Sequence, residues 1–181
     1  MREVTTVSGK IVIIDTSIMC CWLNVCNKET CGPENDKWDK ARVDDFINSM
    51  IKEGASLVLP LPVIIETGNH IAQASSMRYE CAVEFIEVIK KAVDEKSPWA
   101  AFSRQSYLWE GEKIKDLIAS WPELVKPNKK GNLSMGDIMI KAVADFYSSF
   151  DSEVKILTGD QGLKTYEKVN ISNIAIPRRR K

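Results

Sequence analysis

The stretch IVIIDTSIMCCWL, residues 11–23, decides the fold expected for this chain. It opens with four β-branched apolar residues, 11–14, a run typical of a strand that is covered on both faces in a parallel sheet. Asp15, Thr16 and Ser17 follow directly. We therefore expect a buried strand that ends at a carboxylate, followed by a helix whose core includes Cys20 and Cys21.

The rest of the chain alternates between helical and strand patterns. Helices are expected over residues 36–52, from Pro62 onward, over 79–94, around 112–121, over 134–150 and over 161–168. Strands are expected at SLVLP (56–60), VKILTGD (154–160) and ISNIAI (171–176). Strands that alternate with helices predict one α/β domain, residues 1–181, with a mainly parallel sheet. In such sheets the ligand site lies beyond the carboxyl ends of the strands.

The composition is that of a soluble protein, with 44% hydrophobic and 28% charged residues and 25 residues of each charge sign. No run approaches the roughly 18 apolar residues of a membrane helix, so no membrane contact is expected. The five cysteines lack zinc-type spacing, which favours reduced thiols in the cytoplasm. Basic runs at 126–130 and in the tail, 177–181, are either phosphate contacts or, more commonly, solvated ends.

Four carboxylates stand at the ends of expected elements. Asp15 and Asp160 each follow a strand, Glu66 lies about one turn into the helix that begins near Pro62, and Asp137 lies in the first turn of the helix over 134–150. The rule for parallel sheets makes them candidates for one shared site.

Each acid also has a purely structural interpretation. Asp15 and Asp160 are suited to capping the helices that follow them, and Ser134 with Asp137 resembles a capping box. Glu66 shares a polar helical stripe with His70, while Ile64, Gly68, Ile71 and Ala72 are expected to face the core. A single histidine makes a poor transition-metal site, so His70 is expected to be structural or at the rim.

Converging carboxylates repel one another and raise each other's pKa unless a cation lies between them. Carboxylate and hydroxyl oxygens favour Mg²⁺ or Mn²⁺ over Zn²⁺, which selects His and Cys. Such ions activate water and neutralise charge on a phosphodiester. The acids therefore predict metal-dependent phosphodiester hydrolysis.

The order of these motifs resembles that of the PIN-domain nucleases. Their pattern is a strand ending in Asp, a Glu near a helix start, an Asp opening a late helix, and a final Asp that is the last residue of a T-x-D sequence at the end of a strand. The matching segments here are IVIIDTS, LPVIIETGNH, SMGDIMIKAVA and KILTGDQGL, which together span nearly the whole chain.

The resemblance implies a three-layer α/β/α fold and a Mg²⁺- or Mn²⁺-dependent endoribonuclease. It assigns metal binding and catalysis to four acids, Asp15, Glu66, Asp137 and Asp160, with Thr16, Ser17 and Thr158 as supporting hydroxyls. Many small members are toxins of bacterial toxin–antitoxin pairs, so the resemblance also implies an RNA substrate, an antitoxin-like protein partner and homodimerisation. The segment from Ser97 to Asn132 is longer than in the compact toxins. Its aromatic residues, interleaved with Arg104 and Lys113, suit either base stacking or, more commonly, packing.

Two other functions fit parts of the pattern. A phosphotransferase of the haloacid-dehalogenase type also begins with a strand ending in Asp, but it needs a second Asp where this chain has Ser17. A catalytically silent PIN-like module, binding RNA or protein, would use the acids only as helix caps.

Overall fold

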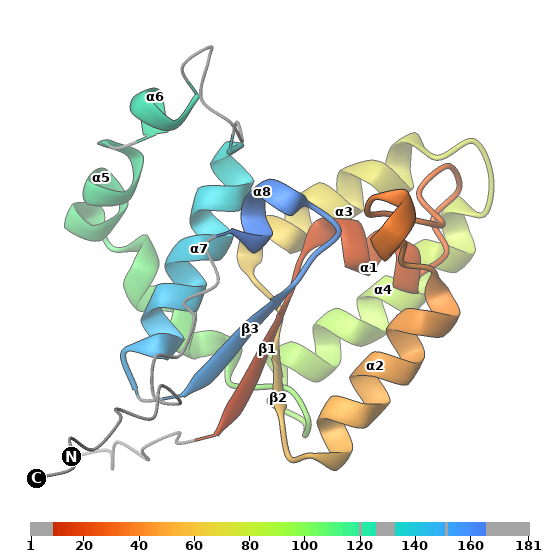
Figure 1. Ribbon diagram of the computed structural model, residues 1–181, viewed down its shortest axis with the longest axis horizontal. Helices are drawn as coiled ribbons and strands as arrows, with labels where there is room; N and C mark the ends of the chain where they lie inside the picture. Colours follow the sequence, from red (N-terminus) through yellow and green to blue (C-terminus); the bar gives the residue numbers. More distant parts are fainter. Residues whose placement is uncertain (1–8, 120, 126–132, 151, 166–181) are drawn as a thin grey trace, which may run out of the picture.

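The computed structural model describes residues 9–119, 121–125, 133–150 and 152–165. Its sheet has three parallel strands, β1 (Lys10–Ile14), β2 (Ser56–Val58) and β3 (Glu153–Leu157), in the order β2-β1-β3 (Figure 1). β1 is central because its four apolar residues are buried on both faces and its backbone pairs with a strand on each side. The predicted α/β class, with a parallel sheet, is confirmed. The strand predicted at 171–176 and the basic runs at 126–130 and 177–181 lie outside the described residues.

Most of the predicted helices are present, with small shifts at their ends. The helices are α1 (Thr16–Trp22), α2 (Lys40–Lys52), α3 (Leu61–Gln73), α4 (Arg78–Val93), α5 (Gly111–Ala119), α6 (Trp121–Leu124), α7 (Met135–Ser148) and α8 (Gln161–Lys164), with short 3-10 segments η1 (Glu34–Asp36) and η2 (Phe102–Trp109). None of the helices in these described ranges has the combination of length and apolar character that crossing a membrane requires.

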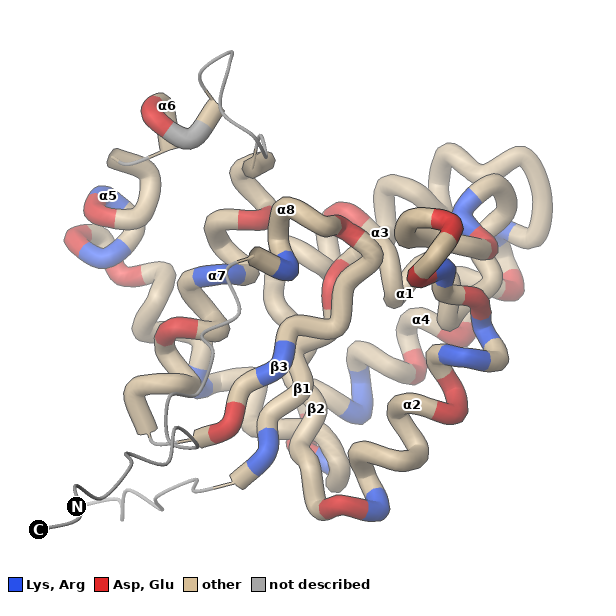
Figure 2. The backbone as a smooth tube through the Cα atoms, viewed as in Figure 1, with Lys and Arg blue, Asp and Glu red and all other residues tan. Residues whose placement is uncertain are grey.

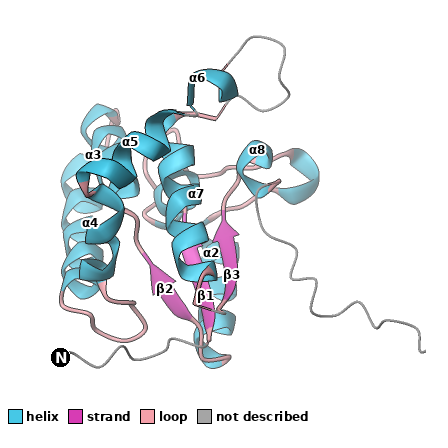
Figure 3. Ribbon diagram, turned by 90° about the vertical axis from the view of Figure 1, so that its left-hand side faces the viewer, coloured by secondary structure: helices cyan, strands magenta, loops and turns pink. Residues whose placement is uncertain are grey.

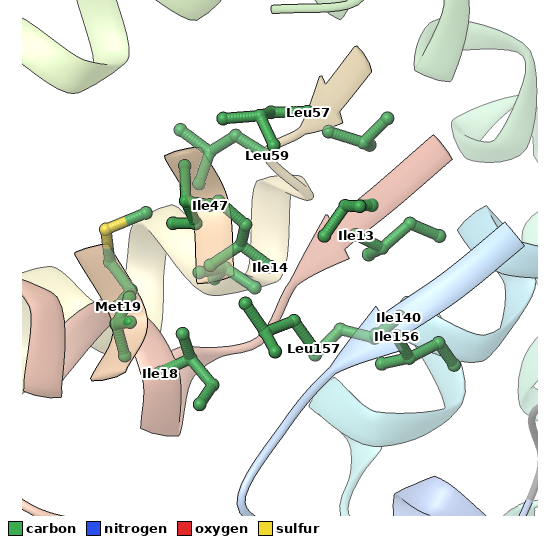
Figure 4. Packing of buried hydrophobic residues seen from close by; sticks show 14 of the residues in the cluster. Ile13, Ile14, Ile18, Met19, Ile47, Leu57, Leu59, Ile140, Ile156 and Leu157 are labelled. Carbon is green, nitrogen blue, oxygen red and sulfur yellow. The ribbon is translucent and has the colours of Figure 1, made fainter. Parts of the chain in front are cut away.

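Helices lie on both sides of the small sheet. α7 packs against β1 and β3, whereas α2 lies on the other side of the strands (Figures 1 and 3). The core between them is aliphatic, and Figure 4 shows Ile47 of α2 and Ile140 of α7 together with strand residues such as Ile13. The core therefore fixes both helices relative to the ends of the strands.

The helix predicted over residues 36–52 begins later than expected. Asp39 caps α2 by accepting a hydrogen bond from the backbone N–H of Arg42 at 2.9 Å, so the helix starts at Lys40. Trp38 is held outside the helix because its backbone pairs with Cys31, and its indole packs edge-on against Phe46. The helical spacing of Trp38 was thus misleading. Trp38 is buried as part of a β-bridge with Cys31 and does not belong to the helix.

The segment after α4 packs against the sheet before it extends away from it. The backbone N–H of Leu57 in β2 donates to the carbonyl of Pro98 at 2.8 Å, and Ala100 donates to Leu57 at 2.8 Å. Trp99, between them, is buried and stacks on Trp22 at a ring-centroid distance of 6.5 Å. Packing, and not base stacking, is therefore the role of Trp99.

Candidate functional site

Asp15 lies directly beyond β1, where that strand passes into α1. Its backbone N–H continues the sheet by donating to Leu157 at 3.0 Å, and its carboxylate caps α1. The side chain is 5% exposed. Its Oδ2 accepts hydrogen bonds from Ser17 Oγ at 2.6 Å and Thr158 Oγ1 at 2.7 Å. The predicted cap is formed, and it is formed by a buried carboxylate.

The same two hydroxyls join the ends of β1 and β3. Ser17 Oγ accepts from the backbone N–H of Gly159 at 3.0 Å, and Thr158 Oγ1 accepts from that of Asp160 at 2.9 Å. Each hydroxyl thus donates to Asp15 while it accepts from the turn after β3. The Asp15 carboxylate is therefore fixed in position by hydrogen bonds from two separate strand ends.

Glu66 approaches this network from α3. Its Oε2 accepts a hydrogen bond from Thr16 Oγ1 at 2.9 Å, so Thr16 links the first helix to the third. The other side of the carboxylate lies against the first turn of α7. A Cβ at Gly136 would lie 2.1 Å from Glu66 Oε1. Glu66 can therefore occupy this place only because residue 136 has no side chain.

The buried face of α3 differs from the predicted one. Val63, Thr67 and Ile71 are buried, whereas Ala72 is exposed and Gly68 is half-buried. The buried stripe passes through Thr67 because α3 packs against both α1 and α4. Glu66 is consequently half-buried at the border of the core and not on an open surface.

Asp137 and Asp160 both cap helices. Asp137 and Ser134 form the complete capping box: Asp137 Oδ2 accepts from the Ser134 N–H at 2.7 Å, and Ser134 Oγ accepts from the Asp137 N–H at 3.1 Å. Asp160 Oδ1 accepts from Gly162 at 2.6 Å at the start of α8. The prediction that Asp137 and Asp160 cap helices is therefore confirmed.

All four predicted acids nevertheless line one cavity of about 470 Å³ beyond the ends of β1 and β3. Figure 2 shows acidic positions gathered in this part of the molecule, around α3, α7 and α8. The predicted Thr16 and Ser17 also line the cavity, whereas the predicted Thr158 acts from behind through Asp15. The remaining lining residues are Cys20, Lys28, Thr30, Cys31, His70 and Ser134.

Lys28, Thr30 and Cys31 were not predicted at this site. They belong to the irregular segment between α1 and η1, where no periodic pattern indicates a direction for any side chain. The one sequence signal is the pair Gly32–Pro33, which marks a turn. That turn brings Cys31 against the loop after β3, because a Cβ at Gly159 would lie 2.6 Å from Cys31 Sγ.

Burial raises the pKa of Asp15 above its ordinary value. Hydrogen bonds from Ser17, Thr158 and the backbone of Thr16 oppose this effect, and the charge of Asp137 adds to it. A buried carboxylate beside a second carboxylate is the situation that a cation relieves. The charge of Asp137 thus acts at Asp15, although the two residues lie on different elements.

All five cysteines are free thiols, and Cys20, Cys21 and Cys81 are buried as core residues. Burial raises the pKa of Cys20 to about 12, which makes it inert at neutral pH. The pKa of Cys31 is lowered, chiefly by a hydrogen bond with Cys21. Of the two cysteines that line the cavity, Cys31 is therefore the one whose thiolate form is favoured.

The donor chemistry of the cavity suits a hard divalent cation, since it offers carboxylate and hydroxyl oxygens. The side chains are not gathered into a closed ligand shell, however. Within the described ranges, no group of three or more His, Cys, Asp or Glu residues is placed to hold a metal ion. The cap hydrogen bonds explain this arrangement, because they draw Asp137 and Asp160 toward their own helix ends.

Comparisons of the chain with protein-family models, curated proteins and solved structures found no match in any of the three. The site must therefore be interpreted from its own geometry.

Proposed function

We propose that this protein is a Mg²⁺- or Mn²⁺-dependent endoribonuclease of the PIN type, with a three-layer α/β/α fold. The observation that carries the proposal is the convergence of four acids from four separate motifs. Asp15, Glu66, Asp137 and Asp160 come from positions 15 to 160 of the chain and line one cavity at the carboxyl ends of two parallel strands. Ligand sites of open parallel sheets lie at this position.

In this proposal the four acids hold the metal, which when bound supplies a Lewis acid and an activated water for phosphodiester hydrolysis. The chain's own residues provide the arrangement. Ser17 and Thr158 orient the Asp15 carboxylate, and Thr16 orients that of Glu66. Lys28, at the cavity wall, supplies a positive charge for a substrate phosphate.

A second candidate is a catalytically silent module in which the acids serve the fold alone. The observation in its favour is that Asp15, Asp137 and Asp160 all make good capping hydrogen bonds. Glu66 argues against it. Glu66 lies within α3 and caps none of the helices for which the described residues show a cap, and its half-buried carboxylate is held against the glycine of another helix.

The partner and cellular role follow from the resemblance alone. We propose RNA as the substrate, the cytoplasm as the location, and a homodimer or an antitoxin-like protein as an assembly partner. The segment over residues 97–132 is longer than in the compact toxins, so the proposal is for a nuclease and does not depend on toxin activity.

The direct test is cleavage of labelled RNA and single-stranded DNA with Mn²⁺, with Mg²⁺ and with EDTA. We expect metal-dependent cleavage of RNA that Asp15→Asn and Asp137→Asn abolish. Asp45→Asn is the matched control, because Asp45 is an exposed acid on α2 outside the cavity. Cleavage in EDTA, or full activity of both site variants, would refute the mechanism.

Calorimetric titration with Mn²⁺ separates the two candidates without relying on a substrate. A nuclease site binds Mn²⁺ in the parent protein and in Asp45→Asn, but binds it weakly or not at all in Asp15→Asn. If the parent protein shows no heat of binding, the acids are caps and the silent module is the correct interpretation.

A further inference from the structure

A second cavity of about 370 Å³ adjoins the acidic one and has the opposite character. It lies between α3, α7 and the segment formed by η2 and α5, and its volume is within the roughly 300–1,000 Å³ typical of small-ligand sites. Its walls are Leu61, Pro62, Ile65, Glu66, Trp109, Ile114, Met135, Gly136 and Met139. Glu66 is the one charged residue among them.

The two cavities meet at Glu66, which lines both. They also border successive residues at the start of α7, since its N-cap Ser134 lines the acidic cavity while Met135 and Gly136 line the apolar one. The Glu66 carboxylate lies directly against Gly136 at the start of α7, so it forms part of the wall that the two cavities share. A nucleic acid that occupies both cavities would pass over Glu66.

The walls suit a flat, uncharged ring. Trp109 is half-buried at the end of η2 and presents an aromatic surface, while Met135 and Met139 present polarisable thioethers. Among the described residues that form these walls, none is cationic, so an anionic group such as a phosphate is disfavoured. Any of the nucleobases can stack on an aromatic side chain, so such a wall binds an unpaired base of any type.

We infer that the apolar cavity at Trp109 binds an unpaired base of the nucleic acid whose backbone occupies the acidic cavity. This inference rests on the proposed function for its ligand. It makes Trp109 a substrate-binding residue and makes the substrate single-stranded next to the cleaved bond. The η2–α5 part of the long segment then acts in recognition, whereas Trp99 of the same segment acts in packing.

The test uses single-stranded RNA octamers, one intact series and one with a single abasic position moved along the chain. Affinity is measured by fluorescence anisotropy in Ca²⁺, and the cleavage pattern separately in Mn²⁺. We expect one abasic position to weaken binding roughly tenfold, as is typical for the loss of one stacked base. Trp109→Ala should weaken binding of the intact octamer to the same extent and remove the effect of the abasic position.

Trp109→Phe should restore most of the affinity, because a phenyl ring still stacks. Tyr79→Ala is the matched control: Tyr79 is an aromatic residue, 78% exposed, beside a different cavity on α4. An octamer carrying 4-thiouridine should photo-crosslink to peptides that contain Trp109, Met135 or Met139. Unchanged affinity of Trp109→Ala, or crosslinks confined to other peptides, overturns the inference.

A protein occupant of the same cavity would give a different result. If the protein forms a dimer that Ile65→Asp dissociates, and the octamers do not compete with that dimer, a second copy fills the cavity and the inference is wrong. The test is also separate from the nuclease test. Binding through Trp109 without cleavage in any metal would refute the nuclease alone, and cleavage that is indifferent to Trp109 would refute the base site alone.

Discussion

Replacing Gly136 with alanine should impair the site while leaving the fold nearly as stable as before. The new Cβ would lie 2.1 Å from Glu66 Oε1 and 2.9 Å from its Cδ. Ordinary contact begins near 3.4 Å, so the carboxylate must retreat by about 1.3 Å, the difference between the two values. That movement breaks or weakens the 2.9 Å hydrogen bond from Thr16.

The two effects on stability nearly cancel. A hydrogen bond to a charged group contributes about 1.5–3 kcal/mol, with the lower end expected at a half-buried site. Alanine is favoured over glycine in a helix by about 0.8–1.0 kcal/mol. The free energy of unfolding, measured with urea, should therefore fall by about 1 kcal/mol or less. A misplacement of about 1 Å in a catalytic group can cost on the order of 100-fold in rate.

The assay compares urea unfolding with Mn²⁺-dependent RNA cleavage for three variants. Gly68→Ala, on α3 with no atom near its added Cβ, should gain stability and keep its activity. Gly136→Ala should lose most of its activity, and adding Glu66→Asp, whose side chain is one methylene shorter, should recover part of it. If folded Gly136→Ala cleaves RNA as fast as the parent, the position of Glu66 does not matter and the reasoning is refuted.

Three further predictions concern the neighbours of this contact. Burial raises the pKa of Asp15, so the folded protein binds a proton at this carboxyl more tightly than the unfolded chain does. The protonated carboxyl therefore adds to the free energy of unfolding below the ordinary pKa of 3.8, and this contribution is lost as the pH rises through the raised pKa. In EDTA, Asp15→Asn should therefore be more stable than the parent in urea unfolding at pH 7, and this advantage should shrink in acid; equal pH profiles would contradict the prediction. Thr158→Val removes a buried donor to Asp15 and should lower the free energy of unfolding at pH 7 by about 1–3 kcal/mol; a loss of less than 0.5 kcal/mol would show that the bond is dispensable. Ser134→Ala removes half of the capping box of α7 and should cost about 1 kcal/mol in thermal unfolding, with Ser134→Asp as the variant that retains it.

The sequence predicts the parts of this molecule that depend on a local repeat or a local end signal. β1 was predicted because a continuous apolar run ends at Asp15, β3 because the short stretch VKIL is followed by TGD, and the start of α7 because Ser134 and Asp137 form their cap within four residues. The convergence of Asp15 and Asp160 on one cavity followed from the parallel sheet, which aligns the carboxyl ends of its strands.

Features that depend on contacts between distant segments were not predictable. Trp38 has helical spacing but lies in a bridge to Cys31, and this pairing determines where α2 begins. Thr67 is polar yet fully buried, because α3 packs against α1, α4 and α7. The apolar cavity at Trp109 likewise needs four elements to meet, and no single one of them carries a pattern that indicates it.

The backbone pairing of Leu57 with residues on either side of Trp99 also covers part of the outer edge of the sheet. β2 is the outer strand of the described sheet on its side, and an outer strand with free N–H and C=O groups is a template for joining another chain. Here Pro98 and Ala100 occupy those groups at Leu57, each at 2.8 Å. A variant shortened in the segment after α4 should keep residues 98–100, since their removal would uncover an apolar strand edge, a feature that favours aggregation.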